Sequence, residues 1–332
     1  MSQKKATAVA HPNIALVKYW GKRDERLILP HQSSLSVTLA PLSVTTTVEF
    51  SAEKGEDVVE LNGKRAEGSE RSRVVELLAA VRLAAGGLGK ARVVSHGDFP
   101  MSAGLASSAA GFAALAVAAR AAAGLPADVR TASRLARSGS GSACRSIQGG
   151  YCAWRRGERA DGEDSYAEQL FPASHWPDLR LVVAVVSRAE KSVKSRDGMR
   201  STVETSPYYR AWADDAEAEL PRAQAFIRAR DLESLGALSE RNAWRMHATA
   251  FAADPPLCYL LPGTLALIQA LPEARAHGTP VWFTLDAGPN PVLLTDAKHE
   301  EAVVALAKKM GALDVVRCHP GGDAKIIERD LF

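Results

Sequence analysis

The chain has 332 residues, of which 46% are hydrophobic and 24% are charged. That composition can bury an ordinary globular core in one large or two smaller domains, and it excludes a disordered chain. The formal net charge of +3 is too small to indicate a nucleic-acid-binding protein. Local clusters of lysine and arginine matter more, because a small anionic ligand needs only a few of them.

Cysteine usage and hydropathy indicate a cytoplasmic protein. The sequence contains four cysteines, Cys144, Cys152, Cys258 and Cys318. They form no CxxC pair and no set with zinc-ligand spacing, so we expect free thiols in a reducing compartment and assign no protein ligand to a metal. Residues 1–10 lack the apolar stretch of a secretory signal, and the alanine-rich residues 103–125 are too weakly apolar for a membrane helix.

The first half of the sequence predicts a mixed α/β domain. Asn62-Gly63 between two short β-rich segments is a strong hairpin signal, and Gly124 follows an alanine-rich segment where a helix would end. We expect strands at residues 43–50 and 91–95 and a hairpin at residues 57–67. We also expect three helices: one at residues 72–85, a long alanine-rich one that ends at about residue 123, and one at residues 127–137.

The second half begins with residues 181–186, LVVAVV, which predict a fully buried strand. Pro221 predicts a break or bend among the helices expected between residues 208 and 251. Further elements are expected as helices at residues 262–276 and 297–310, a hairpin at residues 281–285 and 291–295, and a last strand at residues 325–328. Residues 154–178 are polar without a clear period, so we predict one domain at residues 1–178 and another at residues 179–332.

Two loops have the composition of phosphate-binding loops. Residues 104–111 read GLASSAAG, and small residues with hydroxyls before a helix suit a phosphate, although a closely packed helix start has the same composition. The Walker pattern is absent, because Ala84 and Ala91 stand where it needs a glycine and a hydroxyl. Residues 138–146 read SGSGSACRS, and Arg145 among so many small residues favours a second anion site over a flexible linker.

Two further segments carry charges suited to such a site. Residues 13–23 read NIALVKYWGKR, in which Lys18 and Lys22 can bind phosphate or, in an amphipathic element, simply face solvent. Asp286 lies in TLDAGPN, where an apolar strand runs into a loop of small residues. A carboxylate there can be held rigidly at the edge of a site, or it can cap a turn.

Taken together, these segments and Ser195-Arg196 with Gly198-Met199 resemble the mevalonate diphosphate decarboxylases of the GHMP kinase superfamily. The GLASS stretch is common to the superfamily, whereas KYWGK, GSGSACRS and DAGPN resemble the decarboxylases specifically. The resemblance runs from about residue 8 to residue 291. It implies an α+β GHMP kinase fold, with an N-terminal α/β domain like domain 2 of ribosomal protein S5, a C-terminal ferredoxin-like α+β domain, and a site in the cleft between them.

The resemblance also implies a reaction. ATP, with Mg²⁺ on its phosphates, would phosphorylate the 3-hydroxyl of mevalonate 5-diphosphate. Loss of that phosphate and of carbon dioxide would then give isopentenyl diphosphate. The expected partners are this small-molecule substrate and ATP, with no nucleic acid and no membrane, and the expected assembly is a homodimer in the cytoplasm.

The family's functional residues map onto this sequence as follows. Asp286 would act as general base or orient the hydroxyl, Arg145 would bind the substrate carboxylate, and Lys18 and Ser195 would lie near the transferred phosphate. Ser192 is an alternative to Ser195, since Lys194 replaces a serine found in many relatives. Expected diphosphate ligands are Tyr19, Lys22, Ser140, Gly141, Ser142 and Arg196, and expected ATP ligands are Gly104, Leu105, Ala106, Ser107 and Ser108.

Three alternatives remain at this stage. One alternative is an enzyme of the same fold that decarboxylates mevalonate 5-phosphate or stops as a mevalonate 3-kinase, but the predicted diphosphate ligands weigh against both. An ordinary kinase of the superfamily would not need KYWGK or DAGPN. A non-catalytic RNA-binding module would need a basic stripe with aromatics, whereas aromatic residues make up only 6% of the chain.

Overall fold

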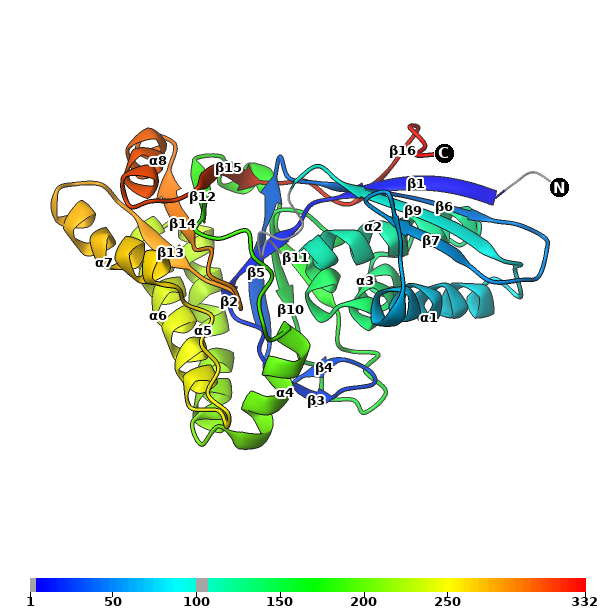
Figure 1. Cartoon of the computed structure of the whole chain (residues 1–332), viewed down its shortest axis with the longest axis horizontal. Helices are drawn as coiled ribbons and strands as arrows, with labels where there is room; N and C mark the ends of the chain where they lie inside the picture. The colour runs from blue at the N-terminus through cyan, green and yellow to red at the C-terminus, as the bar shows by residue number, and fades with distance from the viewer. Residues whose placement is uncertain (1–3, 100–106) are drawn as a thin grey trace.

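A computed structural model describes residues 4–99 and 107–332 of the chain. Its first sheet has six strands, in the order β16 (Lys325–Ile327), β1 (Lys4–Ala10), β6 (Val44–Phe50), β9 (Ala91–Gly97), β7 (Val58–Leu61) and β8 (Lys64–Arg65). Three helices lie on one side of this sheet (Figure 1), where α1 (Gly68–Ala84) and α3 (Val129–Gly139) pack beside α2 (Ser107–Ala122). The alanines of α2 are almost all buried, and their small side chains let the helix pack closely on β1 and β6.

The second sheet has eight strands and crosses the middle of the molecule. Its order is β11 (Ala167–Phe171), β10 (Tyr151–Trp154), β5 (Ser34–Ala40), β15 (Asp314–Pro320), β12 (Leu179–Val185), β14 (Val292–Asp296) and β13 (Trp282–Thr284), and β2 (Asn13–Val17) pairs with β5. Leu181 and Val183 of β12 pack into one hydrophobic core, and Val182 and Ala184 pack into another. From Leu181 to Val185 the strand is apolar at every position, because both of its faces are buried there.

The remaining elements flank this second sheet. Helices α5 (Tyr209–Ala229), α6 (Leu232–Phe251), α7 (Pro262–Ala276) and α8 (Glu300–Lys309) lie at the end of the molecule opposite α1 (Figure 1). Between the two ends lie α4 (Ser195–Thr205) and the hairpin of β3 (Lys22–Asp24) and β4 (Leu29–Pro30). Two 3₁₀ helices are η1 (Gly141–Ser146) and η2 (Ala173–His175). None of the helices in the described ranges is long and apolar enough to span a membrane.

Most expected elements are confirmed, with small changes at their ends. The hairpin at Asn62-Gly63 is present, with both residues at positive φ, and the helix at residues 262–276 has the predicted bounds. The expected break at Pro221 is wrong, because α5 continues through it. Helix α4 was not predicted, and neither were the strands β1, β2, β3, β4, β5, β10, β11 and β15.

Strand pairing joins distant parts of the chain. β16 pairs with β1, so residues 325–327 complete a sheet built from the first half of the chain. β15 pairs with β5 through His319 and Pro320, opposite Ala40 and Leu39. The division of the chain at residue 178 stays a prediction.

Candidate active site

Lys18 and Asp286 form a buried ion pair. Lys18 follows β2 and is 1% exposed, and its Nζ lies 2.6 Å from Oδ1 of Asp286, which follows β13. Lys18 Nζ also donates to the carbonyl of Ala15 at 2.8 Å. Burial lowers the pKa of Lys18, while the contact with Asp286 opposes that shift. Residues 268 positions apart in the sequence therefore meet, and the side chain of Asp286 stays about one-third exposed.

Arg145 lies close to this pair, but its own hydrogen-bond partners carry no charge. It is 2% exposed, and its guanidinium donates to Oδ1 of Asn13 at 3.3 Å and to the hydroxyl of Ser34 at 2.5 Å. Burial lowers the pKa of this guanidinium. Both partners are neutral, and no carboxylate of the described residues lies within ion-pair distance of it. A buried cation with neutral partners is suited to an anionic ligand, because burying an unpaired charge is otherwise costly.

Tyr19 and Lys22 lie at either end of the irregular segment that joins β2 to β3. The hydroxyl of Tyr19 is buried without a hydrogen-bond partner among the described residues, and it faces Gly141 so closely that a Cβ there would lie 2.8 Å from it. Only glycine leaves room for this approach. Lys22 is 7% exposed and pairs with Glu25, and burial lowers the pKa of Lys22. Tyr19 therefore has a hydroxyl without a partner among the described residues, whereas the ammonium group of Lys22 is shared with Glu25.

The two glycine-rich loops lie next to each other. Ser108, at the start of α2, has its hydroxyl 3.4 Å from that of Ser140, which precedes η1. Ser142 lies on η1 and accepts from Asn13 through its carbonyl at 3.1 Å. The expected ligands Gly104, Leu105 and Ala106 lie outside the described residues, whereas Ser107 begins α2.

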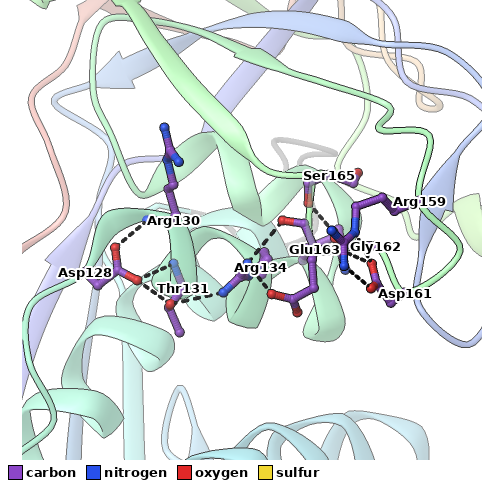
Figure 2. Close-up of polar contacts among 10 residues, drawn as sticks. Asp128, Arg130, Thr131, Arg134, Arg159, Asp161, Gly162, Glu163 and Ser165 are labelled. Atoms are coloured by element: carbon purple, nitrogen blue, oxygen red, sulfur yellow. Dashed lines mark hydrogen bonds and ion pairs between the residues drawn. The ribbon is translucent and has the colours of Figure 1, made fainter.

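Polar contacts at the surface hold α3, the helix that leads into the second loop. Asp128 caps its first turn by accepting from the backbone N–H groups of Arg130 and Thr131 (Figure 2). Arg134 donates to the carbonyl of Glu163 at 3.1 Å and also pairs with its carboxylate. These contacts tie α3 to the segment after β10 and so support the position of Ser140, which joins α3 to η1.

Helix α4 contributes the residues expected around the transferred phosphate. Ser195 is its first residue, and its hydroxyl accepts from Lys191 Nζ at 2.6 Å. Lys191 also donates to the carbonyl of Ala287 at 2.6 Å, which ties this loop to the segment after Asp286. Ser192 is exposed and Arg196 is exposed on the first turn of α4. The geometry favours Ser195 over Ser192, because Ser195 shares Lys191 with the Asp286 loop.

A pocket between α1 and α2 was missed in the sequence. The pocket is open to solvent and has a cavity volume of about 120 Å³, and its lining includes Asn62, Arg73, Ser95, Ser107 and Phe112. The Arg73 guanidinium lies 5.1 Å from the centre of the Phe112 ring. Its Nη1 also lies 3.4 Å from the carbonyl of Gly139, beside the second loop. No sequence signal marks Arg73, since it is one of several charged residues on an ordinary helix. Asn13 was noted in a motif but given no role.

Comparison with known proteins places this geometry in a family. The family model described as diphosphomevalonate decarboxylase-like N-terminal domain matches residues 10–167, and that described as mevalonate 5-diphosphate decarboxylase C-terminal domain matches residues 181–318. The chain belongs to the diphosphomevalonate decarboxylase family. Among its relatives, the diphosphomevalonate decarboxylase of Homo sapiens is 43% identical over 307 residues, which cover 87% of this chain and 76% of the human protein.

Solved structures of the family have the same fold. The mevalonate diphosphate decarboxylase from Enterococcus faecalis is 41% identical, with a TM-score of 0.90 over 99% of this chain and 100% of that chain. A structure of MDDEF in complex with MVAPP, AMPPCP and magnesium is 42% identical, with a TM-score of 0.91 over 99% and 100% of the two chains. The resemblance drawn from the sequence is confirmed, and so is the expected α+β GHMP kinase fold.

Proposed function

We propose that the chain catalyses the ATP-dependent decarboxylation of mevalonate 5-diphosphate to isopentenyl diphosphate, with release of ADP, phosphate and carbon dioxide. The observation that carries the proposal is the Lys18–Asp286 pair beside Arg145, a buried cation with neutral partners. A carboxylate to handle a hydroxyl and a cation to hold a carboxylate are what this reaction requires. Membership of the decarboxylase family and the relatives' complexes with substrate and an ATP analogue support it.

ATP fits the pocket between α1 and α2 and the adjoining start of α2. Apolar walls such as Phe112 suit a nucleoside, and the free backbone N–H groups in the first turn of a helix attract phosphate. The hydroxyl oxygens of Ser107 and Ser108 are hard donors that suit Mg²⁺, which prefers to keep waters and phosphate oxygens as its other ligands. Bound Mg²⁺ would neutralise part of the charge on the ATP phosphates.

The reaction proceeds in two stages whose electrons balance. The oxygen of the 3-hydroxyl bonds to the γ-phosphorus of ATP while the bond to ADP breaks, and the hydroxyl proton is lost. The bond between C3 and the phosphate oxygen then breaks, and phosphate leaves with that electron pair. The bond between C2 and the carboxylate breaks, and its electrons form the new double bond as carbon dioxide departs.

Each residue acts on one part of this sequence. Asp286 takes the hydroxyl proton, or orients the hydroxyl and later stabilises positive charge at C3. Lys18 holds the Asp286 carboxylate in place through its 2.6 Å contact. Arg145 binds the substrate carboxylate until it leaves, and Ser195 lies beside the transferred phosphate.

The diphosphate end of the substrate is assigned to residues 19–22, to the glycine-rich loop at residues 138–146 and to the start of α4. Its ligands are Tyr19, Lys22, Ser140, Gly141, Ser142 and Arg196. Lys22 and Arg196 supply positive charge, and the unpartnered hydroxyl of Tyr19 supplies a donor. The neighbouring hydroxyls of Ser108 and Ser140 bring the ATP and substrate phosphates within reach of each other.

The test is an assay of the purified protein with ATP, Mg²⁺ and mevalonate 5-diphosphate that follows ADP and carbon dioxide together. We expect equal amounts of the two products, and neither with Asp286→Asn. ADP without carbon dioxide would indicate a kinase that stops at the 3-phosphate. If neither product forms, the same assay with mevalonate 5-phosphate and mevalonate tests the related activities.

We also infer that the enzyme works in the cytoplasm as a homodimer. The four cysteines are free, and three of them are buried, which suits a reducing compartment. The homodimer rests on the family resemblance. Sedimentation velocity at enzyme concentrations from about 0.1 to 10 μM, a range around common dissociation constants, would measure the assembly.

A further inference from the structure

Helix α6 contacts both segments that carry the Lys18–Asp286 pair. Asn242 accepts a hydrogen bond through Oδ1 from the backbone N–H of Lys18 at 2.8 Å. Nε2 of His247 lies 3.3 Å from the carbonyl oxygen of Leu285, the residue before Asp286. A carbonyl oxygen can only accept, so Nε2 carries the proton and donates. One helix thus holds the backbone at Lys18 and the backbone next to Asp286.

The amide of Asn242 is held in one orientation. Its Nδ2 donates to Oε2 of Glu219 on α5 at 2.6 Å, while Arg241 donates to the other oxygen of that carboxylate at 2.7 and 2.9 Å. A carboxylate only accepts and a backbone N–H only donates. Asn242 alone satisfies both, because an amide accepts on one side and donates on the other. It is fully buried, so water does not replace these bonds.

The two segments are also tied directly to each other. The carbonyl of Ala15 in β2 accepts from Lys18 Nζ at 2.8 Å and from the hydroxyl of Thr284 in β13 at 2.8 Å. This contact fixes one side of the pair, and α6 fixes the other. His247 is 1% exposed and, like Asn242, reaches the backbone of the site without being part of the ion pair.

We propose that Asn242 and His247 are positioning residues, and that α6 sets the distance and direction between Lys18 and Asp286 during the reaction. This inference rests on the proposed function and adds to it the residues that hold the reacting groups in place. Neither residue is assigned to a substrate. Their loss should therefore lower kcat and leave the binding of both substrates nearly unchanged, since misplacing a reacting group by about 1 Å can cost about 100-fold in rate.

The test compares variants that keep or remove each bond. His247→Leu removes the donor to Leu285, whereas His247→Gln can replace it with an amide N–H. Asn242→Leu removes both amide bonds at similar volume. Thr249→Val is the matched control, because Thr249 is buried on the same helix and, among the described residues, its hydroxyl bonds only to the carbonyl of Met246 at 2.7 Å.

We expect kcat to fall about 10- to 100-fold in His247→Leu and Asn242→Leu, with KM for each substrate and the calorimetric Kd for mevalonate diphosphate within about threefold of wild type. His247→Gln should recover to within about threefold, and Thr249→Val should match wild type. Wild-type kcat in both leucine variants, or an equal loss in the control, would overturn the proposal. So would a loss of Kd that equals the loss of kcat.

Two further results keep this test separate from that of the proposed function. If Asn242→Leu does not fold, the comparison of His247→Leu with His247→Gln decides. If the wild-type protein forms no product, the proposed function fails, and crystal structures of the two His247 variants judge the positioning without reference to activity. We then expect the Lys18–Asp286 contact of 2.6 Å to be kept in His247→Gln and displaced by about 0.5 Å or more in His247→Leu. An unchanged contact in both would overturn the proposal.

Discussion

The ammonium groups of Lys18 and Lys22 lie four residues apart in the sequence but have different surroundings. Lys18 is enclosed, and its ammonium group is bonded to Asp286 and to the carbonyl of Ala15. Around Lys22, the cations are less completely neutralised. Lys22 pairs with a half-exposed Glu25, and Arg196 has no carboxylate within ion-pair distance among the described residues.

On the proposed function, this difference separates the residues that take part in the chemistry from those that bind the diphosphate. Where a proton or phosphoryl group must be handled, the protein supplies both charges and fixes them by hydrogen bonds, so little reorganisation is needed during the reaction. Where a diphosphate must enter and leave, the protein supplies the cations, and the ligand brings most of the negative charge. Lys18 should therefore govern kcat and Lys22 should govern KM.

The largest effect is expected at Lys18. Lys18→Met should lower kcat about 1,000-fold, because Asp286 loses the group that orients it, and should leave KM for both substrates nearly unchanged. The fold should survive, since Asp286 is one-third exposed and water can solvate its carboxylate. Steady-state kinetics with both products measured, together with a melting curve, check this. A rise in KM as large as the fall in kcat would remove the distinction drawn between the two lysines.

A smaller effect is expected at Arg145. Arg145→Gln should lower the rate of carbon dioxide release about 100-fold, because the substrate carboxylate loses a charge-assisted contact, and ADP should exceed carbon dioxide. The melting temperature should not fall, since Arg145 has neutral partners and its removal leaves no opposite charge unpaired. Arg134→Gln, at the surface pair with Glu163, is the control and should keep wild-type kinetics. Equal ADP and carbon dioxide at a normal rate would contradict the role given to Arg145.

Substitution of Lys22 is expected to change KM and to leave kcat nearly unchanged. Lys22→Met should raise KM for mevalonate diphosphate about tenfold, the effect of losing one charged hydrogen bond, and keep kcat within about threefold. KM for ATP serves as the internal control and should not change. A large loss of kcat at saturating substrate would contradict this prediction.

The smallest effect at neutral pH is expected from the protonation of His247. Burial, with the nearby Lys18 charge adding to it and Asp286 opposing it, lowers the pKa of His247 to about 4. The unfolded chain takes up this proton below about pH 6.5 and the folded chain does not, so the free energy of unfolding falls as pH drops from 6.5 to 4, by about 3 kcal/mol for this residue. Above pH 7 there is no such contribution.

His247→Gln removes this titration. Urea unfolding of the variant and the wild type at several pH values between 4 and 7.5 measures the difference, in which the carboxylates common to both proteins cancel. We expect the wild type to lose more stability than the variant as the pH falls. Parallel curves for the two proteins would show that His247 is not held neutral.

Local sequence signals predicted the elements better than the site. Asn62-Gly63 and the alanine-rich segment before Gly124 specify their structures locally, because a turn needs positive φ and close packing needs small side chains. The break predicted at Pro221 is wrong, since α5 continues through this residue. The contact between Lys18 and Asp286 is not a local property, and only the resemblance brought those two residues together.

No pattern in the sequence marks the residues that hold the site in place. Asn242 and His247 lie on a helix among charged residues, and a polar side chain that faces a buried backbone group has the same sequence context as one that faces water. Arg73 was missed for the same reason. Residues that hold a site in place are visible only when their partners, here Lys18 and Leu285, are placed beside them.

The pairing of β16 with β1 has a consequence for protein synthesis. β1 leaves the ribosome early, but the strand that covers its outer edge is translated more than 300 residues later. Until then the nascent chain carries a strand whose outer N–H and C=O groups are unpaired, the kind of edge on which other chains can pair. The first sheet is therefore completed only after every strand of the second sheet has been translated, although its other strands all precede residue 98.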